Sequence, residues 1–137
     1  MTMQLSVAVR NAMLDAYETA IGTGAIVKLR TGAQPATCAT ADSGTVVATI
    51  TLATDWMAAA SSGSKAFSST PLVDSSADNA GTIGHYRVYA SDGTTCHDQG
   101  SVTVTGGGGD MTVDNNVVTA GQQVSITSWS KNMSGHA

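Results

Sequence analysis

Cysteine and histidine are the residues of this sequence with the most distinctive chemistry. Cys96 and His97 are adjacent, His85 lies twelve residues before His97, and Cys38 stands alone. A structural zinc site needs four Cys or His ligands, usually as two close pairs, and no second pair is present in the sequence. Neighbouring strand residues point to opposite faces, so a Cys96–His97 nucleophilic pair is not expected either. We expect Cys96 to face inward and His97 outward at the start of a strand.

The two cysteines, Cys38 and Cys96, could also pair with each other. Cys38 precedes a predicted strand at 45–52, and Cys96 follows a predicted turn at 91–94, so both lie near strand ends and could be neighbours. The sequence leaves open whether they form a disulfide or stay adjacent free thiols. A disulfide closing a loop of this length would add about 4 kcal/mol of stability. Cysteines of a protein made in a cytoplasm are free by default.

Other patterns of catalytic or ligand-binding residues are weak. The aspartates fall in predicted turns or at strand ends, where Asp caps backbone N–H groups, and they are too sparse for a calcium site. The glycine run 106–109 lacks the Lys-Ser/Thr of a phosphate loop, and no G-x-S-x-G occurs. We therefore expect a protein that is not an enzyme and has no cofactor or metal. The alternative, an enzyme without a recognisable sequence motif, would need a pocket where several polar groups converge.

Aromatic side chains allow one more interpretation. Four of them could form a carbohydrate-binding face: Trp56, Tyr86, Tyr89 and Trp129. Because aromatic residues make up only 4% of the sequence, the core could equally need all of them.

The elements that must position these residues begin with a helix. Residues 5–21 predict one amphipathic helix, capped by Ser6 and ended by Gly22. Its apolar stripe has a period of 3.6 and consists of Val9, Ala12, Met13, Ala16, Tyr17 and Ala20. A helix of this length is marginal alone, so the stripe must dock on the protein's own sheet or on a partner subunit.

The rest of the sequence indicates short β-strands. Alternation predicts strands at 25–30 and 45–52, a weaker one at 65–73, and a hairpin at 85–105 around the Asp-Gly turn 91–94. In the hairpin, Tyr86, Val88 and Ala90 share one face, and His85, Arg87 and Tyr89 share the other. We expect a loop at 74–84, a flexible link at 106–110, and short strands over 111–130, where Trp129 alternates with Val124 and Ile126. The pattern predicts a mainly β protein: one antiparallel β-sandwich domain over 1–137 with an N-terminal helix.

Composition narrows the classes of partner. The 137 residues carry a net charge of −4, and only 12% are charged, about half the usual share of roughly 25%. The six basic residues are scattered, so we expect no nucleic-acid partner. No apolar run reaches the roughly 20 residues of a membrane span, and the first residues lack a secretion signal. We expect synthesis in a cytoplasm and a working state packed against other proteins.

Much of the sequence resembles a group of small structural proteins of tailed-phage virions, which includes the jelly-roll cement (decoration) proteins of short-tailed phage capsids. The similar segments occur in order and cover most of the chain: LSVAVRNAMLDAYETAIGTGAIVKLRTGAQP, CATADSGTVVATITLATDWMAAASSGSKAF, AGTIGHYRVYASDGTTCHDQGSV and DMTVDNNVVTAGQQVSITSWS. They are specific as an ordered set, but none of them encodes a chemical role.

The resemblance implies a jelly-roll subunit on the outside of an icosahedral shell, made in the host bacterial cytoplasm, dimeric, and clamping neighbouring major capsid proteins. An alternative is a tail-tip or tail-fibre-associated protein that recognises a host surface. Segments not needed for the sandwich are the expected partner contacts: residues 1–6, the loop 74–84 and the tail from Ser130. Their representative residues are Met1, Thr2, Met3, Asp74, Asp78, Lys131, Asn132 and Met133.

Overall fold

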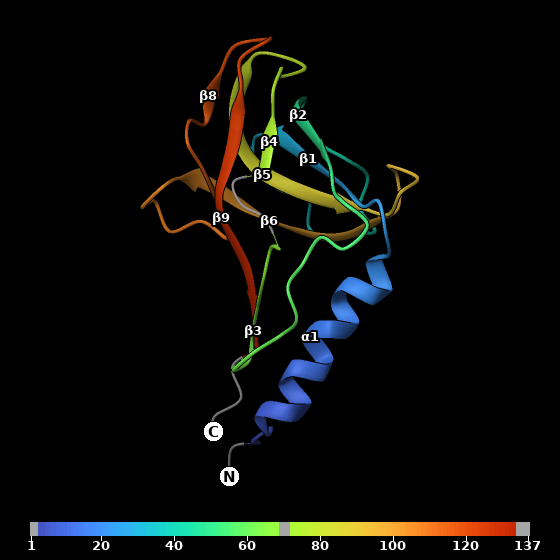
Figure 1. Ribbon diagram of the computed structural model, residues 1–137. Coiled ribbons are helices and arrows are strands. Elements are labelled where there is room, and N and C mark those ends of the chain that lie inside the picture. The colour runs from blue at the N-terminus through green and yellow to red at the C-terminus, as the bar shows by residue number, and fades with distance from the viewer. Residues whose placement is uncertain (1–2, 69–71, 134–137) are drawn as a thin grey trace.

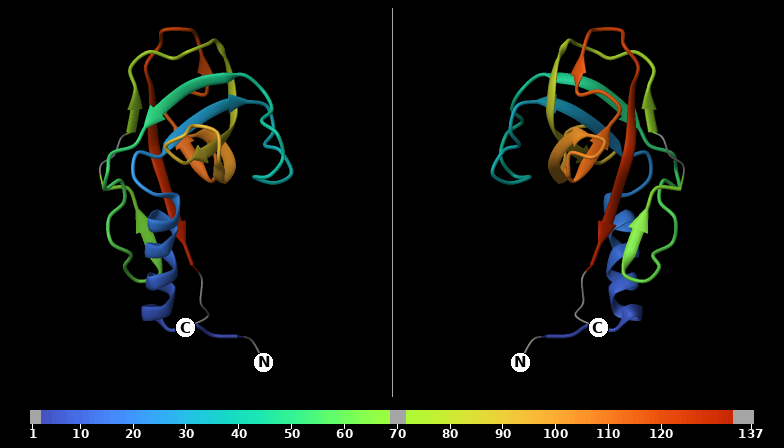
Figure 2. Two further views of the ribbon diagram at one scale, coloured as in Figure 1. Left: turned by 90° about the vertical axis from the view of Figure 1, so that its right-hand side faces the viewer. Right: turned by 90° about the vertical axis from the view of Figure 1, so that its left-hand side faces the viewer.

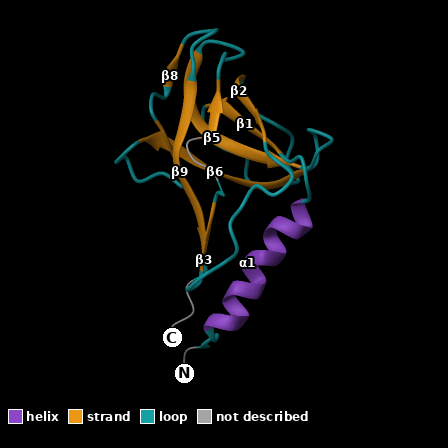
Figure 3. Ribbon diagram, in the orientation of Figure 1, coloured by secondary structure: helices purple, strands orange, loops and turns teal. Residues whose placement is uncertain are grey.

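A computed structural model describes residues 3–68 and 72–133 of the chain (Figure 1). One helix is followed by strands that make up most of the regular structure (Figure 3). The elements in chain order are α1 (Val7–Ile21), β1 (Ile26–Thr31), β2 (Val46–Thr51), β3 (Ser64–Ala66), β4 (Leu72–Asp74), β5 (Gly81–Tyr89), β6 (Cys96–Val104), β7 (Met111–Val113), β8 (Val117–Val118) and β9 (Val124–Asn132). The prediction of a mainly β fold with an N-terminal helix is confirmed.

The strands form one curled sheet in the order β2-β1-β5-β6-β7-β9-β3, with β4 paired to β9 and β8 paired to β5. The sheet curls far enough for residues of β1, β2 and β5 to meet residues of β7 and β9 in one hydrophobic core (Figures 1 and 2). The arrangement is consistent with a sandwich-like or jelly-roll-like fold. All described strand pairs are antiparallel except β6 with β7, which is parallel, so the sheet is mixed.

The helix begins and ends where its capping residues predict. The Ser6 hydroxyl accepts a hydrogen bond from the Val9 N–H at 3.3 Å. Gly22, with φ +90°, ends the helix, and its N–H donates to the Glu18 carbonyl. Both devices satisfy backbone groups that the helix itself leaves unpaired.

The β5–β6 hairpin is the centre of the sheet. Its turn is closed by the Ala90 N–H donating to the Thr95 carbonyl at 2.9 Å. The Asp92 carboxylate accepts from the N–H groups of Thr94 and Thr95 and from the Thr95 hydroxyl, and these bonds lower the pKa of Asp92 to about 2. The hairpin is confirmed, but β5 begins at Gly81, so the last part of the predicted loop 74–84 is strand.

The segment 105–110 is an ordered turn, and the prediction of a flexible link is wrong. The Gly109 N–H donates to the Thr103 hydroxyl at 2.9 Å, and Asp110 accepts from the Ser101 N–H and hydroxyl. A Cβ at Gly107 would lie 2.7 Å from the Thr103 side chain. The missing side chains therefore let the chain double back against β6, which places β7 parallel to it.

Two other predictions about strands need correction. The weak strand 65–73 is two separate strands, β3 and β4, and residues 69–71 between them lie outside the described part of the chain. In β9 the expected alternation fails, because the pairing with β7 shifts register near Thr112. As a result Trp129 turns inward beside Val124 and Ile126 and is 4% exposed.

Candidate functional site

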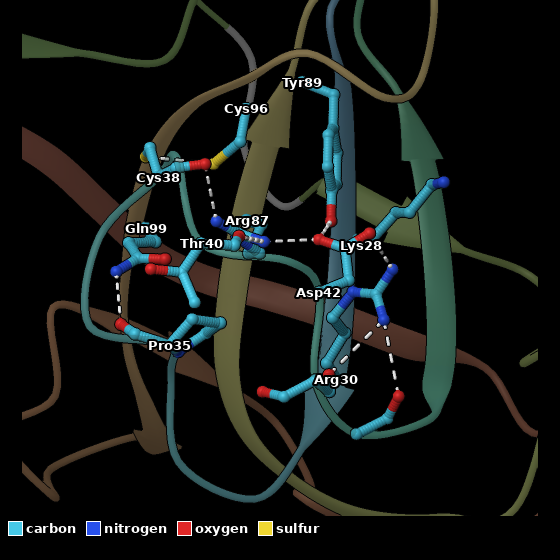
Figure 4. Close-up of polar contacts among 12 residues, drawn as sticks. Lys28, Arg30, Pro35, Cys38, Thr40, Asp42, Arg87, Tyr89, Cys96 and Gln99 are labelled. Atoms are coloured by element: carbon cyan, nitrogen blue, oxygen red, sulfur yellow. Dashed lines mark hydrogen bonds and ion pairs between the residues drawn. The ribbon is translucent and has the colours of Figure 1, made fainter.

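The residues between β1 and β2 fold over one face of the sheet, and we call residues 32–45 the cover loop (Figure 4). They lie on the side of β5 opposite the hydrophobic core. A Cβ on Gly84 of β5 would lie 2.2 Å from the Gly32 carbonyl oxygen, so the loop crosses directly against the strand. His85, Arg87 and Tyr89, which share this face of β5 as the alternation predicts, are therefore buried: at most 1% of each is exposed.

Arg87 holds the middle of the cover loop. Its guanidinium donates to the carbonyls of Thr37, Cys38 and Thr40 at 3.0–3.1 Å and to the carboxylate of Asp42 (Figure 4). Among the described residues Arg87 is the donor to the Cys38 and Thr40 carbonyls, whereas the Thr37 carbonyl also accepts from the Thr40 N–H at 3.1 Å. The fork of the guanidinium suits this task, because it offers several donors in fixed directions.

Asp42 joins the loop to two strands. It accepts from Arg87 and from the Tyr89 hydroxyl of β5, and it pairs with Arg30 of β1 at 2.8 Å. Burial acts to raise the pKa of Asp42, but the hydrogen bonds from Tyr89 and Arg87 and the two guanidinium charges outweigh it and lower the pKa below its ordinary value. Burial and the bond to Asp42 raise the pKa of Tyr89 to about 12. The carboxylate is thus ionised and the phenol neutral at pH 7.

His85 lies beneath the start of the loop. Its Nδ1 lies 2.8 Å from the Gly32 carbonyl oxygen and must carry the proton, because a carbonyl only accepts. Its Nε2 is buried and has no partner among the described residues. Burial, together with the charges of Arg30 and Arg87, lowers the pKa of His85 against the raising effects of Gly32 and Asp42. His85 is therefore a neutral structural residue.

The cysteine pair lies at the edge of the cover loop. Cys38 belongs to the loop, Cys96 is the first residue of β6, and their sulfur atoms are 2.9 Å apart as free thiols. The structure thus brings together the two residues that the sequence analysis paired. Cys96 shares the face of Tyr89, its partner across the hairpin, so it points toward the loop and not into the hydrophobic core. His97 is exposed, as expected.

On the other side of the sheet, α1 is held by polar contacts to β3 and the segment before it. The buried ammonium of Lys65 pairs with Asp15 at 2.7 Å and with Glu18 at 3.1 Å. Glu18 also accepts from the N–H groups of Trp56 and Met57. Burial tends to lower the pKa of Lys65, but the two carboxylates outweigh it and raise the pKa.

Further contacts hold both ends of this unit. Arg10 donates to the Met133 carbonyl at 3.3 Å, and the Asn11 side chain accepts from the Gly63 N–H at 2.9 Å. Near the other end of the helix, the Tyr17 hydroxyl donates to Asp98 of β6 at 2.9 Å. The helix is thereby fixed beside β3 and the end of β9, and the three project together from the body of the sheet (Figures 1 and 2).

The predicted apolar stripe of α1 is not the face that packs on the sheet. Leu14, Ile21 and the aliphatic part of Arg10 are buried, whereas Val9 and Met13 are 45% and 46% exposed. The interpretation in which the stripe docks on the protein's own sheet holds only for Tyr17, which is half-buried and packs against the core. Arg10, Asp15 and Glu18 are the charged residues of the described helix, and each contacts the chain's own backbone or Lys65. The exposed face that remains is largely apolar; we call it the outer face of α1, formed by Ala8, Val9, Ala12, Met13, Ala16 and Ala20. The exposed Asp15 and Thr19 lie beside it, three residues from Ala12 and Ala16.

Aromatic residues form part of the core and not a surface platform. Trp56 and Trp129 stack with ring centroids 6.4 Å apart, and each is at most 4% exposed. Tyr86 lies edge-on to Trp129, and its hydroxyl accepts from Lys131, which also pairs with Asp98. The carbohydrate-face interpretation is therefore wrong for these side chains.

The other predicted contact residues are placed as follows. Met1 and Thr2 lie outside the described residues, and Met3 is 74% exposed. Asp74 accepts from the Thr49 N–H and Asp78 from the Thr49 hydroxyl, so both cover the free edge of β2. The predicted contact residues of the tail belong to the sheet, because β9 pairs with β3 up to Asn132. Lys131 lies opposite Lys65, and Asn132 lies opposite Ser64. The Met133 N–H then donates to the Gly63 carbonyl.

None of the six basic side chains, all of which lie in the described part of the chain, is exposed. Arg10, Arg30, Lys65 and Arg87 are buried, and Lys28 and Lys131 are half-buried. Every one belongs to a helix or a strand. The sequence shows the number of basic residues but not this placement, and the one hint is the run GHYRVY, which sets polar groups inside a strand.

Among residues 3–68 and 72–133, no three His, Cys, Asp or Glu side chains gather closely enough to hold a metal ion together. A hollow of about 300 Å³ beside the end of α1 is lined by Glu18, Thr19, Gly22, Thr23 and Thr54. Glu18 is its titratable group, and that carboxylate is occupied by Lys65 and two backbone N–H groups. No helix in the described residues has the length and apolar character needed to cross a membrane.

Comparisons of the chain with protein-family models, with curated proteins and with solved structures found no match.

Proposed function

We propose that this chain is a structural protein of a tailed-phage virion, a capsid cement protein that binds the outside of the shell and clamps major capsid proteins. The observation that carries the proposal is the largely apolar outer face of α1. Surface helices of soluble proteins ordinarily turn their charged residues to water and their apolar stripe inward. Here Arg10 and Glu18 point into the molecule and the stripe, apart from Tyr17, remains outside, which favours a face made to be covered.

The size of this face favours a repeated surface as its partner. At a rise of 1.5 Å per residue, α1 is about 22 Å long and about 10 Å wide. Its outer face therefore supplies only part of the roughly 800 Å² per partner that a standard stable interface needs. A shell presents the same contact many times, so a modest affinity at each position is sufficient. Self-association into a dimer is part of the proposal and is measured separately, by sedimentation of the free protein.

Rigid positioning supports the same role. The helix is held by Lys65 and by contacts at both ends, so it loses little conformational freedom when it docks. The Ala residues at every fourth position of the outer face also allow another backbone to approach closely.

Binding to shells that lack this chain tests the proposal. Wild-type protein should sediment with the shells, and Ala12→Glu should reduce its apparent affinity at least about tenfold, because the charge would be buried unpaired. Val117→Glu is the matched control, since Val117 is 63% exposed and lies on β8, outside α1. Equal binding of the two variants would exclude the outer face of α1 as the contact.

The number of copies per particle separates the main proposal from its alternative. Quantitative mass spectrometry of purified particles should give a ratio to the major capsid protein near one for a cement protein. A ratio of a few per cent would contradict the cement role and favour a tail-tip or tail-fibre-associated protein that recognises a host surface. Loss of shell resistance to heat when the chain is omitted is expected only for a cement protein.

A further inference from the structure

The two cysteines lie in a place where oxidation would have a defined structural result. Their sulfur atoms are 2.9 Å apart although the residues are 58 positions apart in the chain, and both residues are partly buried. Cys38 belongs to the cover loop and Cys96 to β6, so a bond between them would join the loop covalently to the sheet.

The backbone around Cys38 is already fixed in position. Arg87 donates to the Cys38 carbonyl at 3.0 Å and to the carbonyls of its neighbours Thr37 and Thr40 at 3.1 Å (Figure 4). Arg87 belongs to β5, which pairs with β6 in the same hairpin. A disulfide requires two side chains brought close without moving the backbone, and here that condition is met by contacts that do not involve sulfur.

We propose that Cys38 and Cys96 are an oxidation site, at which a low-molecular-weight disulfide such as oxidised glutathione converts the two thiols into a disulfide that ties the cover loop to β6. This inference concerns the isolated chain and does not depend on the proposed virion role.

The chemistry balances in two exchange steps. The thiolate of one cysteine attacks a sulfur of oxidised glutathione, forms a mixed disulfide and releases one glutathione thiolate, which takes up the proton lost by the cysteine. The second cysteine loses its proton and attacks the mixed disulfide, so the Cys38–Cys96 bond forms and the second glutathione leaves. The protein loses two electrons and two protons, and one molecule of oxidised glutathione becomes two of glutathione.

We therefore expect two free thiols in a reducing cytoplasm and a Cys38–Cys96 disulfide in an oxidising medium. Burial, and then the neighbouring Cys38, raise the pKa of Cys96 to about 11, so its thiol is protonated at pH 7. Since only the thiolate is nucleophilic, oxidation should be slow at neutral pH and faster at higher pH. The thiols stay reduced where glutathione is reduced, and the disulfide forms after release into an oxidising medium.

The experiment compares folded, reduced protein before and after incubation with oxidised glutathione at pH 8. Thiol titration in denaturant should fall from two thiols per chain to none, with a mass lower by two hydrogens. The melting temperature should rise by about 10 °C. Hydrogen exchange of residues 32–45 should slow, whereas exchange of the glycine turn 105–110 should not change.

Serine variants provide the controls. Cys38→Ser and Cys96→Ser should each take up one glutathione and show no rise in melting temperature. Three results would overturn the inference: two thiols that persist in the folded wild-type protein, glutathione bound to both cysteines, or covalent dimers in place of an internal bond. None of these results would bear on binding to shells, so the two proposals fail separately.

Discussion

The cover loop and α1 are both peripheral segments held to the sheet by buried charge, but they leave opposite surfaces outside. The cover loop turns its carbonyls and Asp42 toward Arg87 and Arg30 and exposes mainly small residues, which are alanine, glycine, threonine and serine. Helix α1 turns Asp15 and Glu18 toward Lys65 and exposes an apolar stripe.

The difference shows how a chain with few charged residues can form two kinds of surface with the same interaction, an ion pair between a buried basic side chain and a carboxylate. In the cover loop the ion pairs of Arg87 and Arg30 with Asp42 hold a surface of small residues, and no large apolar side chain of the loop is exposed. In α1 the same interaction sets the helix in a fixed orientation with its apolar side outward. Buried ion pairs are poor evidence of stability, since desolvation offsets their attraction, and a role in fixing one arrangement is the better explanation for both.

The largest effect is expected from Arg87→Leu. The substitution would leave the carbonyls of Cys38 and Thr40 without their donor, and Asp42 without one of its two guanidinium partners. The Thr37 carbonyl would keep the Thr40 N–H as a donor. We expect the free energy of unfolding to fall by about 3 kcal/mol, measured by urea denaturation. Arg30→Leu should cost less, because its two contacts to loop carbonyls are long, at 3.4 Å. Equal losses would show that Arg87 is not the main residue holding the loop.

A smaller loss is expected from Lys65→Met, the equivalent change beneath α1. Methionine fills the space of the aliphatic chain, and the side chains of Asp15 and Glu18 are 51% and 19% exposed, so water can solvate both once the ammonium is gone. We expect a loss of about 2 kcal/mol in the same urea experiment. A loss larger than that of Arg87→Leu would reverse the comparison and make α1 the more strongly held segment.

Acid should weaken the side of the sheet that the cover loop protects. The pKa of His85 is lowered in the folded chain, so the unfolded chain takes up a proton first as the pH falls below about 6.5. Stability is therefore lost as the pH falls from 7 toward 5, by at most about 1.4 kcal/mol per pH unit. His85→Asn, which keeps a donor for the Gly32 carbonyl, should flatten this slope in urea denaturation.

The exposed His97 gives the control for this experiment, because His97→Asn should leave the slope unchanged. The aspartates with lowered pKa values, Asp42 among them, add their own loss only at pH values near 4 and below. A flat profile of the wild-type protein between pH 7 and 5 would contradict the buried, neutral state of His85.

The smallest effect is expected at the outer face of α1. Ala12→Glu in the free protein should change the free energy of unfolding by no more than about 0.5 kcal/mol, since the side chain meets water and glutamate suits a helix. Urea denaturation of this variant beside the wild-type protein gives the value. A large loss would mean that the face is used within the fold, and that reduced shell binding of the variant reports misfolding.

Local signals in the sequence predicted the elements well. The Ser6 cap, the Gly22 stop and the Asp-Gly turn act within a few residues of themselves, so their outcomes do not depend on distant parts of the chain. Alternation located β1, β2 and β5 for the same reason. The glycine run failed as a signal, because glycine permits both a mobile link and a tight turn, and the choice rests on the packing against Thr103.

The candidate surfaces required long-range information. An apolar stripe shows that a helix has two sides, but which side packs on the sheet depends on partners such as Lys65, which lies about fifty residues away from Asp15. The burial of Arg87 and His85 could not be predicted for a similar reason: nothing in β5 indicates that the cover loop returns across it. The pairing of Cys38 with Cys96 could be suggested, because both lie near the ends of strands.

All six basic residues lie in a helix or a strand, and this placement also determines how readily trypsin can cleave the folded chain. This protease cleaves after Lys and Arg and must draw several residues around the bond into an extended shape, which here means breaking α1, β1, β3, β5 or β9. Cleavage of the native protein therefore requires the fold to open first. When opening and closing are fast relative to cleavage, the rate of digestion follows the population of the open form. Digestive proteases of this specificity would find no ready site in the described residues of the native chain.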